Sequence, residues 1–327
     1  MIDTIEATDS ATISLAASPT MSGEETKVSE RLICVAELPE NYRLADFLHF
    51  HQRDASMLAE QVEANCLRKG LAWRGEAACL TISFENRLAR AELALDGPLS
   101  ESDEAALEAM VRRMLGLTQR IEAFEATYRD HAQVGRLISK NPGLRLPVSA
   151  MPFEALTWAV TGQQISVSAA VSLRRNLIEA AGIKHSGGLH CYPDAVAILG
   201  MDEATLRQAG FSQAKAATLL ELSRLIVAGR LPLDTWLEGE PTDKLAEHLL
   251  QVRGVGPWTV SYALLRGFGW LDGSLHGDAA VRRALQTLLD RSDKVGDEEA
   301  KIWLAPFSPW RALIAAHLWA WESATVY

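Results

Sequence analysis

Apolar and polar positions follow two different periods along this chain. Strand-like alternation with β-branched residues occurs at 31–38, 78–85 and 88–97, and the last of these segments precedes a Gly-Pro break. Between the first two segments, residues 44–56 and 58–68 carry apolar side chains at helical spacing, which predicts two helices. Short strands and helices bounded by turn residues are typical of a small α+β domain with an antiparallel sheet.

Helical spacing dominates the rest of the chain. Ser102 and Asp103 are candidate caps for the first of these helices, and Gly182 is a residue type at which helices commonly end. The segments with helical spacing are 102–117, 151–182, 202–210, 212–229, 242–251, 257–268, 278–290 and 308–323. We therefore expect an α+β protein with an antiparallel-sheet domain at 31–118 and an all-helical domain at 119–327.

Charge separates the beginning of the chain from the rest. The net charge of −10 argues against a protein that coats nucleic acid by bulk attraction, but it allows a local basic face. Acidic residues, Ser and Thr dominate the opening segment without periodicity, which predicts a disordered tail at 1–30. The tail is acidic where a signal peptide is basic, and no apolar run approaches the roughly 20 residues of a membrane helix. We expect a cytoplasmic protein that does not act at a membrane.

The cysteines carry no recognisable pattern. The chain has 4 of them, Cys34, Cys66, Cys79 and Cys191, with no C-x-x-C pair and no His-rich partner segment. The sequence therefore predicts neither a disulfide framework nor a zinc site, and we assign no metal ligands.

Two glycines and a proline interrupt the helical pattern at "VRGVGP", residues 252–257. Gly254 and Gly256 allow backbone geometry that a Cβ would obstruct, and Pro257 suits the first position of a new helix. The pattern predicts a tight hairpin between two helices, with backbone N–H groups directed to one spot where a phosphate oxygen can bind. On spacing alone, an ordinary helix-to-helix corner is the more common explanation, because Gly-x-Gly often precedes a helix.

The neighbours of the hairpin make the pattern more specific. "TGQQISVSAA" at 161–170 precedes it and "GFGWLDGSLHGD" at 267–278 follows it. Together with "VRGVGPWTVSYALL", these segments resemble the helix-hairpin-helix DNA glycosylase superfamily, whose hairpin has the form L-x-G-V-G-x-x-T-A followed by a Gly/Pro-rich stretch and one aspartate. The chain is most similar to the 3-methyladenine DNA glycosylase II (AlkA) branch, and the resemblance extends from about Arg31 to Trp321.

The resemblance assigns the catalytic role to Asp278. A carboxylate beside the anomeric carbon stabilises the positive charge that develops when an N-glycosidic bond breaks, and it can orient a water molecule. Asp278 is also a candidate N-cap with Arg282 as an i,i+4 partner, and the two roles are compatible. Trp258 stands where strand-cleaving relatives carry a lysine nucleophile. The resemblance thus implies a monofunctional glycosylase that excises alkylated purines in base excision repair and leaves an abasic site.

A pocket for an extruded base needs aromatic faces. Trp258 and Tyr262 are one helical turn apart and share a face, and Trp319 matches the other pocket tryptophan of the family. Phe47 is assigned to the pocket on the short match "FL". A cationic alkylated base over such rings gains about 0.5–2 kcal/mol. Core packing is the alternative role for these side chains.

The remaining candidates would contact the duplex. Gln164 matches the residue that fills the gap left by the extruded base in the AlkA branch, and Gln163 matches that residue in strand-cleaving relatives. For phosphate binding the candidates are the amides of Gly254 and Gly256, assisted by the side chains of Lys215 and Arg283. The two glutamines are also consistent with ordinary surface residues, and the two basic residues with solvated helix faces.

These assignments imply double-stranded DNA as partner and a monomer as the working form. No cofactor is required, although the family's hairpin can hold a monovalent cation through backbone carbonyls. Three other functions remain open at this point: a glycosylase for oxidised or deaminated bases, a non-catalytic module that binds damaged DNA, and an all-helical scaffold.

Overall fold

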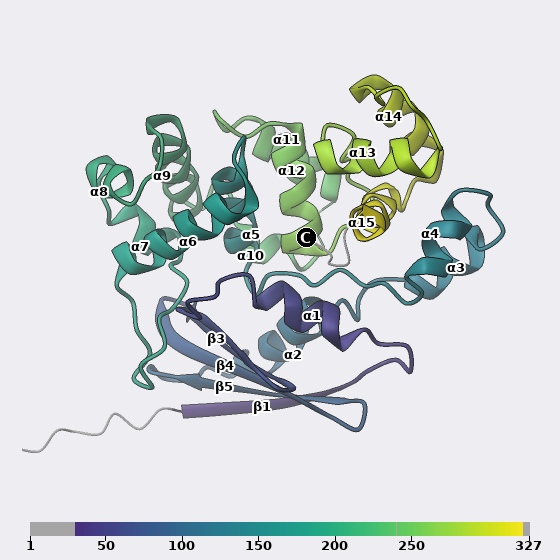
Figure 1. Ribbon diagram of the computed structural model, residues 1–327. Coiled ribbons are helices and arrows are strands. Elements are labelled where there is room, and N and C mark those ends of the chain that lie inside the picture. The colour runs from purple at the N-terminus through teal and green to yellow at the C-terminus, as the bar shows by residue number, and fades with distance from the viewer. Residues whose placement is uncertain (1–29, 240, 323–327) are drawn as a thin grey trace, which may run out of the picture.

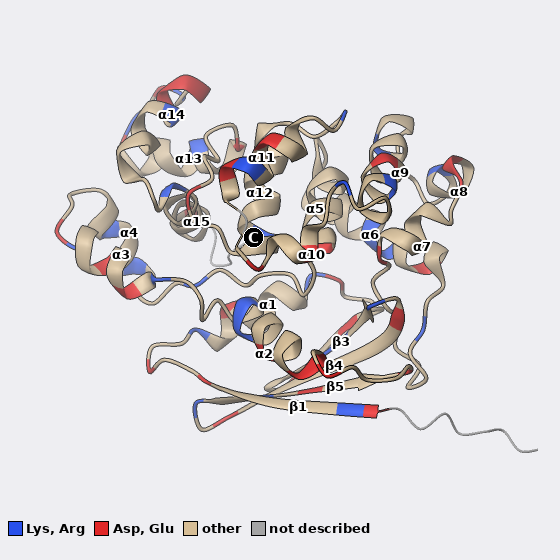
Figure 2. Ribbon diagram, turned by 180° about the vertical axis from the view of Figure 1, so that it is seen from behind, with Lys and Arg blue, Asp and Glu red and all other residues tan. Residues whose placement is uncertain are grey.

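The computed structural model describes residues 30–239 and 241–322. Of the tail predicted at 1–30, only Glu30 lies within these residues. In Figure 1 a sheet forms one end of the molecule, helices α1 (Leu44–His51) and α2 (Asp103–Met114) lie against its inner face, and the other helices lie beyond them. Figure 2 shows both signs of charge interspersed over the helices, with an acidic first turn in α14 (Asp297–Leu304).

The sheet is antiparallel, as the sequence predicts, and it has five strands in the order β1-β5-β4-β3-β2. Its strands are β1 (Glu30–Glu37), β2 (Glu60–Glu63), β3 (Cys66–Trp73), β4 (Glu76–Glu85) and β5 (Leu88–Leu95). Two-residue turns with positive φ join β3 to β4 at Arg74 and Gly75, and β4 to β5 at Asn86 and Arg87. Turns of this kind match the twist of paired strands and fix their register.

Residues 58–68, predicted as a helix, instead form the hairpin of β2 and β3. Glu63 pairs with Cys66 at its end, and Ala64 has φ +47°, a conformation that a right-handed helix does not contain. Leu, Ala, Glu and Gln give this segment favourable helix propensity, but strand pairing and burial of Val62 in the core outweigh it. The prediction was wrong because propensity carries no information about distant strand partners.

One hydrophobic core joins the sheet to α1 and α2. Leu80, Ile82 and Leu93 are fully buried on the inner face of the sheet, where they pack with Phe47 of α1 and Met114 of α2. Alternate residues of each strand therefore build this core.

The rest of the chain is helical, as predicted. Its elements are α3 (Ile121–Tyr128), α4 (Val134–Lys140), α5 (Pro152–Gly162), α6 (Val167–Ala181), α7 (Ala195–Leu199), α8 (Glu203–Gln208), α9 (Gln213–Val227), α10 (Leu233–Trp236), α11 (Thr242–Leu250), α12 (Pro257–Ala263), a π-helical turn η1 (Leu264–Phe268), α13 (Ala279–Leu288), α14, a 3-10 turn η2 (Ala305–Phe307) and α15 (Arg311–Glu322). The sequence did not predict α3, α4, α7, α10 and α14. Each of these helices has eight residues or fewer, which is too short to establish a clear period.

Two hydrophobic cores stabilise the helical part. One involves mainly α3, α4, α13, α14 and α15, and the other mainly α5 to α11. Helix α12 lies between them (Figure 1) and supplies Tyr262 to the first core and Val260 and Ala263 to the second. The hairpin that leads into α12 therefore lies where the two halves of the helical domain meet.

The sheet and helical domains make a tight contact. A Cβ on Gly70 of β3 would lie 2.0 Å from the carbonyl oxygen of His190, and Tyr192 donates its backbone N–H to Gly70. Only glycine allows β3 to approach this loop so closely. The domains are consequently joined by direct backbone pairing.

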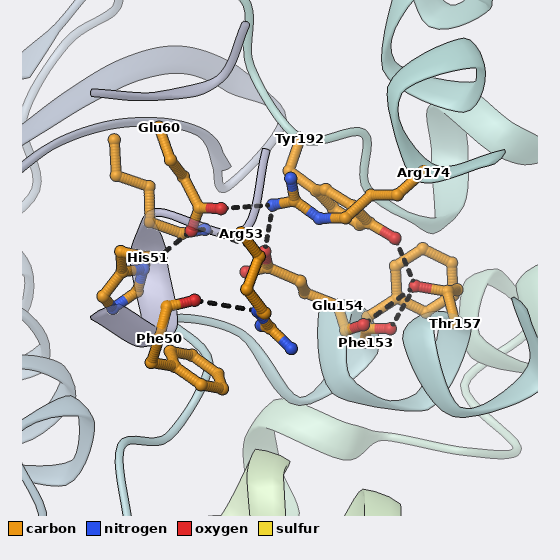
Figure 3. A network of polar contacts seen from close by, with 10 residues as sticks. Phe50, His51, Arg53, Glu60, Phe153, Glu154, Thr157, Arg174 and Tyr192 are labelled. Atoms are coloured by element: carbon orange, nitrogen blue, oxygen red, sulfur yellow. Dashed lines mark hydrogen bonds and ion pairs between the residues drawn. The ribbon is translucent and has the colours of Figure 1, made fainter. Parts of the chain in front are cut away.

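Buried charges cross the same interface (Figure 3). Lys69 Nζ on β3 lies 2.7 Å from Glu60 of β2 and 2.8 Å from Glu154 of α5, and Arg174 of α6 pairs with both carboxylates. Burial alone raises the pKa of Glu154, but Lys69 and Arg174 lower it below its ordinary value overall. Nδ1 of His51 donates to the ionised carboxylate of Glu60 at 2.7 Å, and burial lowers the pKa of His51. We refer to Lys69, Glu60, Glu154 and Arg174 as the interface network.

Candidate active site

A cavity of about 1000 Å³ lies where the two cores of the helical domain meet. This volume is at the upper end of the range, about 300–1,000 Å³, that small-molecule sites occupy. The sequence-predicted residues that line it are Asp278, Trp258, Tyr262, Trp319, Gln163, Gln164, Gly254, Gly256 and Arg283. Segments far apart in sequence therefore converge on one cavity, in agreement with their proposed joint role.

Asp278 is the N-cap of α13, as predicted. Its Oδ1 accepts hydrogen bonds from the backbone N–H groups of Ala280 (2.9 Å) and Val281 (3.0 Å). Two indoles complete its environment, because Trp319 donates to Oδ1 at 3.2 Å and Trp258 to Oδ2 at 3.1 Å. Four donors and the N-terminus of α13 therefore fix the direction of this carboxylate.

The predicted ion pair between Asp278 and Arg282 does not form. Arg282 pairs with Asp297 at 3.0 Å. Arg282 therefore does not neutralise the carboxylate of Asp278, which accepts from two indoles and two backbone N–H groups, all of them uncharged. Such an arrangement leaves its negative charge available for a developing cation.

Aromatic side chains form the wall next to Asp278. The rings of Trp258 and Tyr262 are stacked with centroids 5.3 Å apart, and Tyr262 lies 6.4 Å from Trp319. Trp158 of α5 donates its indole N–H to the hydroxyl of Tyr262 at 3.0 Å and also lines the cavity. The sequence analysis did not identify Trp158, although it lies only a few residues before the turn that carries Gln163 and Gln164.

Phe47 does not line the cavity. Its side chain is 1% exposed and lies in the core of the sheet domain, with its ring centroid 5.5 Å from that of Phe84. The pocket assignment of Phe47 is corrected accordingly: the apolar face of α1 is used to cover the sheet. The sheet domain contributes Arg53 to the cavity instead, from the segment that follows α1.

The hairpin glycines are there for different reasons. Gly254 has φ +90°, and a Cβ there would lie 2.1 Å from Oγ1 of Thr218 on α9. Gly256 has φ −102°, and nothing lies within 4 Å of an added Cβ. Packing within the chain therefore requires glycine at 254 but not at 256, where the open space faces the cavity. Pro257 is the first residue of α12, as predicted.

The hairpin carbonyls already have partners. The oxygens of Val252, Arg253 and Gly254 accept from Val255 N–H, Thr218 Oγ1 and Gln163 Nε2, respectively. Each carbonyl retains a second lone pair, which is what a monovalent cation would use. The cation at the hairpin remains a prediction.

The turn between α5 and α6 separates the two glutamines. Gln163 donates from Nε2 to the carbonyl of Gly254 and to Thr259 Oγ1, each at 2.9 Å, so it braces this turn against the hairpin. Gln164 is exposed, lines the cavity and has φ +58°. Ile165 beside it is also exposed (38%). Of the two glutamines, Gln164 is therefore the one free to enter the gap that an extruded base leaves in the duplex.

The two candidate basic residues differ in availability. Lys215 donates from Nζ to the carbonyl of Thr161 at 2.8 Å, does not line the cavity, and has its pKa lowered by partial burial. It ties α9 to the end of α5. Arg283 is exposed on α13, lines the cavity and forms a 3.2 Å ion pair with Glu322. Arg283 is therefore the candidate that a phosphate can reach.

Within residues 30–239 and 241–322, no cluster of three or more His, Cys, Asp or Glu side chains is arranged to hold a metal ion. Among these same residues, no helix combines the length and apolarity needed to cross a membrane. Asp278 is the sole carboxylate among the described residues that line the cavity.

Two family models match the chain in succession. The AlkA N-terminal domain matches residues 38–150, and the HhH-GPD superfamily of base excision DNA repair proteins matches residues 157–305. The second range contains the hairpin, the turn between α5 and α6 and Asp278, and the first contains Arg53 and every strand of the sheet except β1. Both parts of the expected architecture are thus represented.

Individual relatives agree with these matches. A DNA-3-methyladenine glycosylase of Bacillus subtilis is 22% identical over 88% of this chain and 96% of its own length. A 3-methyladenine DNA glycosylase from Archaeoglobus fulgidus has the same fold, with a TM-score of 0.72 and 20% identity over 88% of this chain and 98% of that one. An 8-oxoguanine glycosylase/lyase of Clostridium acetobutylicum, solved with double-stranded DNA, superposes with a TM-score of 0.66 at 16% identity, covering 90% and 97% of the two chains.

Proposed function

Because the chain belongs to the HhH-GPD superfamily of base excision DNA repair proteins, in its AlkA branch, we propose that it is a DNA glycosylase that excises alkylated purines from double-stranded DNA. The observation that carries this proposal is the carboxylate of Asp278, held by two indoles and a helix N-terminus inside an aromatic cavity. A non-catalytic binding module has no use for such a carboxylate, and a scaffold has no use for the cavity.

The chemistry follows from the position of Asp278. The bond between the sugar C1′ and the purine nitrogen breaks, and the base leaves with the electron pair. A purine alkylated at N3 or N7 already carries a positive charge, so it departs as a neutral molecule. The sugar becomes cationic, Asp278 stabilises that charge, and the oxygen of a water molecule forms the new bond to C1′ while its proton passes to the carboxylate or solvent.

The aromatic wall accounts for the choice of substrate. An extruded base can stack on the rings of Trp258 and Tyr262, and a cationic base gains further attraction from their π-electrons. Extrusion costs a few kcal/mol, least for a damaged or mismatched base. Gln164, exposed at the turn beside the cavity, is the side chain that fills the vacated position.

The expected products are a free base and an intact strand with an abasic site. Cleavage of the strand by a glycosylase of this family requires an amine that forms a Schiff base. No lysine is found among the described residues that line the cavity, and tryptophan stands at position 258. These two observations support hydrolysis without lyase activity. We also propose that the protein acts on DNA as a monomer.

A single-turnover assay tests the function. Duplex DNA methylated at purines is incubated with the protein and with Asp278→Asn, and released bases and strand breaks are scored separately, before and after alkali. We expect base release that is lost in the variant, and breaks that appear only after alkali. Breaks without alkali contradict the absence of lyase activity, and release that is indifferent to Asp278 contradicts the catalytic assignment.

A further inference from the structure

Arg53 brings a positive charge from the sheet domain into the base cavity. Its Nε donates to the carbonyl of Phe50 at 2.8 Å, and its guanidinium carbon lies 4.0 Å from the centre of the Phe50 ring and 4.6 Å from that of Trp158. In the described part of the chain, no carboxylate pairs with Arg53, and no hydrogen bond uses its two terminal amino groups. These groups are therefore available to a ligand in the cavity that Arg53 lines.

The residues on either side of Arg53 are anchored to other elements. His51 is hydrogen-bonded to Glu60 of the interface network, and the carboxylate of Asp54 pairs with Arg175 of α6 at 2.6 Å. Figure 3 shows Arg53 beside this network, with its guanidinium directed away from Glu60 and toward Phe50. Short anchored flanks and stacking between two rings hold the side chain in one place, which is what selective recognition requires.

Trp158 connects Arg53 to the rest of the pocket. It follows Glu154 by one turn of α5, so the helix that carries the interface network also carries the ring under the guanidinium. The indole of Trp158 donates to the hydroxyl of Tyr262, whose ring stacks on Trp258. Arg53 thus belongs to the same wall as the aromatic residues on which an extruded base would stack.

The charges around the cavity are unevenly distributed. Asp278 is at one side, held by Trp258 and Trp319, and Arg283 on the same helix lines the cavity but forms an ion pair with Glu322. Arg53 is at another, and the buried guanidinium of Arg266 lies behind it, 4.9 Å from the ring of Phe50 and 6.0 Å from that of Trp319. A base that reaches toward Arg53 therefore meets positive charge, which favours acceptor atoms on that edge and disfavours a cation.

Purines differ on the edge that such a side chain can contact. Hypoxanthine presents two acceptors, O6 and N7, and arginine donates to this pair in two parallel bonds. In 7-methylguanine O6 remains but N7 is blocked and the ring is cationic. In 3-methyladenine the C6 substituent is an amino group, a donor that faces another donor, and the ring is again cationic.

We propose that Arg53 is a specificity-determining residue that recognises the O6 and N7 acceptors of a 6-oxopurine, so that it raises the excision of hypoxanthine relative to that of 3-methyladenine, whose positive charge is bound by the aromatic wall alone. This inference rests on the proposed glycosylase function and deepens it. Undamaged guanine presents the same two acceptors, but hypoxanthine opposite thymine is mispaired and costs less to extrude.

The test compares excision rates for three bases in single turnover at saturating protein: hypoxanthine opposite thymine, 7-methylguanine and 3-methyladenine. Arg53→Gln removes the charge and the two parallel donors, and Arg53→Lys keeps the charge alone. We expect Arg53→Gln to slow hypoxanthine excision roughly tenfold or more while leaving 3-methyladenine excision unchanged or faster. Arg53→Lys is expected to restore only part of the hypoxanthine rate, because a point charge cannot make the paired bonds.

Other outcomes overturn the inference. An equal loss for all three bases, with a weaker dependence on salt, means that Arg53 binds the DNA backbone instead. An equal loss together with a lower unfolding midpoint means that it only supports the fold, and unchanged rate ratios mean that it is not a specificity determinant. If the unsubstituted protein releases none of the three bases, the proposed function itself fails, whereas release with unaltered ratios in the variants rejects this inference alone.

Discussion

The indole of Trp319 donates to Oδ1 of Asp278 over 3.2 Å, although 41 residues separate the two in sequence. Trp258 donates to Oδ2 at 3.1 Å, so each oxygen of the carboxylate has an indole partner. The same Oδ1 caps α13. The carboxylate is therefore oriented before any substrate arrives, which is the condition under which it stabilises a developing charge most effectively.

Replacing Trp319 by phenylalanine tests this orientation. The ring remains, but one hydrogen bond to a charged group is lost, a change of about 1.5–3 kcal/mol. We expect single-turnover base release to slow roughly tenfold or more, with little change in DNA affinity. Trp303→Phe is the matched control, since Trp303 packs on Phe307 and does not line the cavity. An equal effect of the two substitutions would contradict the role of the hydrogen bond.

Alanine at the two hairpin glycines is expected to change different properties: stability at Gly254 and DNA binding at Gly256. Gly254→Ala meets Thr218 and a positive φ, so it should lower the free energy of unfolding by about 1–3 kcal/mol. Gly256→Ala meets nothing within the chain and should leave the urea midpoint unchanged. If DNA backbone approaches this position, the added methyl group should weaken binding to duplex DNA about tenfold. Unchanged affinity in Gly256→Ala would place the phosphate contact elsewhere.

The two glutamines of the turn after α5 are also expected to affect different properties when each is replaced by alanine. Gln164→Ala removes an exposed side chain and should slow base release without changing stability, because the space left by the extruded nucleotide is no longer filled. Gln163→Ala removes two hydrogen bonds to the hairpin and should lower the unfolding midpoint as well. Fluorescence of 2-aminopurine next to the damaged base measures extrusion directly. Equal extrusion in Gln164→Ala and the parent protein would exclude the wedge role.

We expect substitution of Glu154, a member of the interface network, to lower the free energy of unfolding substantially. Glu154→Gln leaves Lys69 and Arg174 buried with one carboxylate in place of two, and breaking a buried pair typically costs about 3–5 kcal/mol. Urea denaturation measures this loss. Glu221→Gln is the control, because its exposed pair with Arg224 contributes about 1 kcal/mol or less. Similar midpoints for the two variants would mean that the network does not hold the domains together.

His317 makes the stability depend on pH. Burial lowers its pKa to about 3, whereas the ordinary value is 6.5. Below pH 6.5 the unfolded chain binds a proton that the folded chain does not, so this contribution is complete above pH 6.5 and is lost as the pH falls toward 3. Urea midpoints measured between pH 7 and pH 4 should fall less steeply in His317→Leu. Exposed His49→Leu should keep the parental slope, and an unaltered slope in His317→Leu would contradict this assignment.

Local signals were sufficient for much of the fold and for the core of the site. Pro257 at the start of α12, Asp278 as the cap of α13 and Gly182 at the end of α6 were predicted from residues within a few positions of each. Capping and turn chemistry depend on the immediate backbone, which a single sequence describes completely. The order of these signals along the chain also led to the correct family.

These local signals could not predict which side chains from distant segments contact one another. The periodicity around Phe47 was helical, as observed, but only packing decided that its ring covers the sheet while Arg53 enters the cavity. Lys215 had the charge of a phosphate ligand, yet its ammonium group is used to tie α9 to α5. In each case the outcome depends on which elements pack together.

The sequence by itself determined that this chain is a helix-hairpin-helix protein with an aspartate as N-cap of the helix after the hairpin. Each of these features depends on residues that are neighbours in the sequence. The tertiary structure decided which side chains surround that aspartate and that Arg53 lines the same cavity. Trp158, Arg53 and the interface network have no local signature, since they act through contacts between residues tens to more than a hundred positions apart. Burial and pairing of this kind arise only when segments distant in sequence pack together.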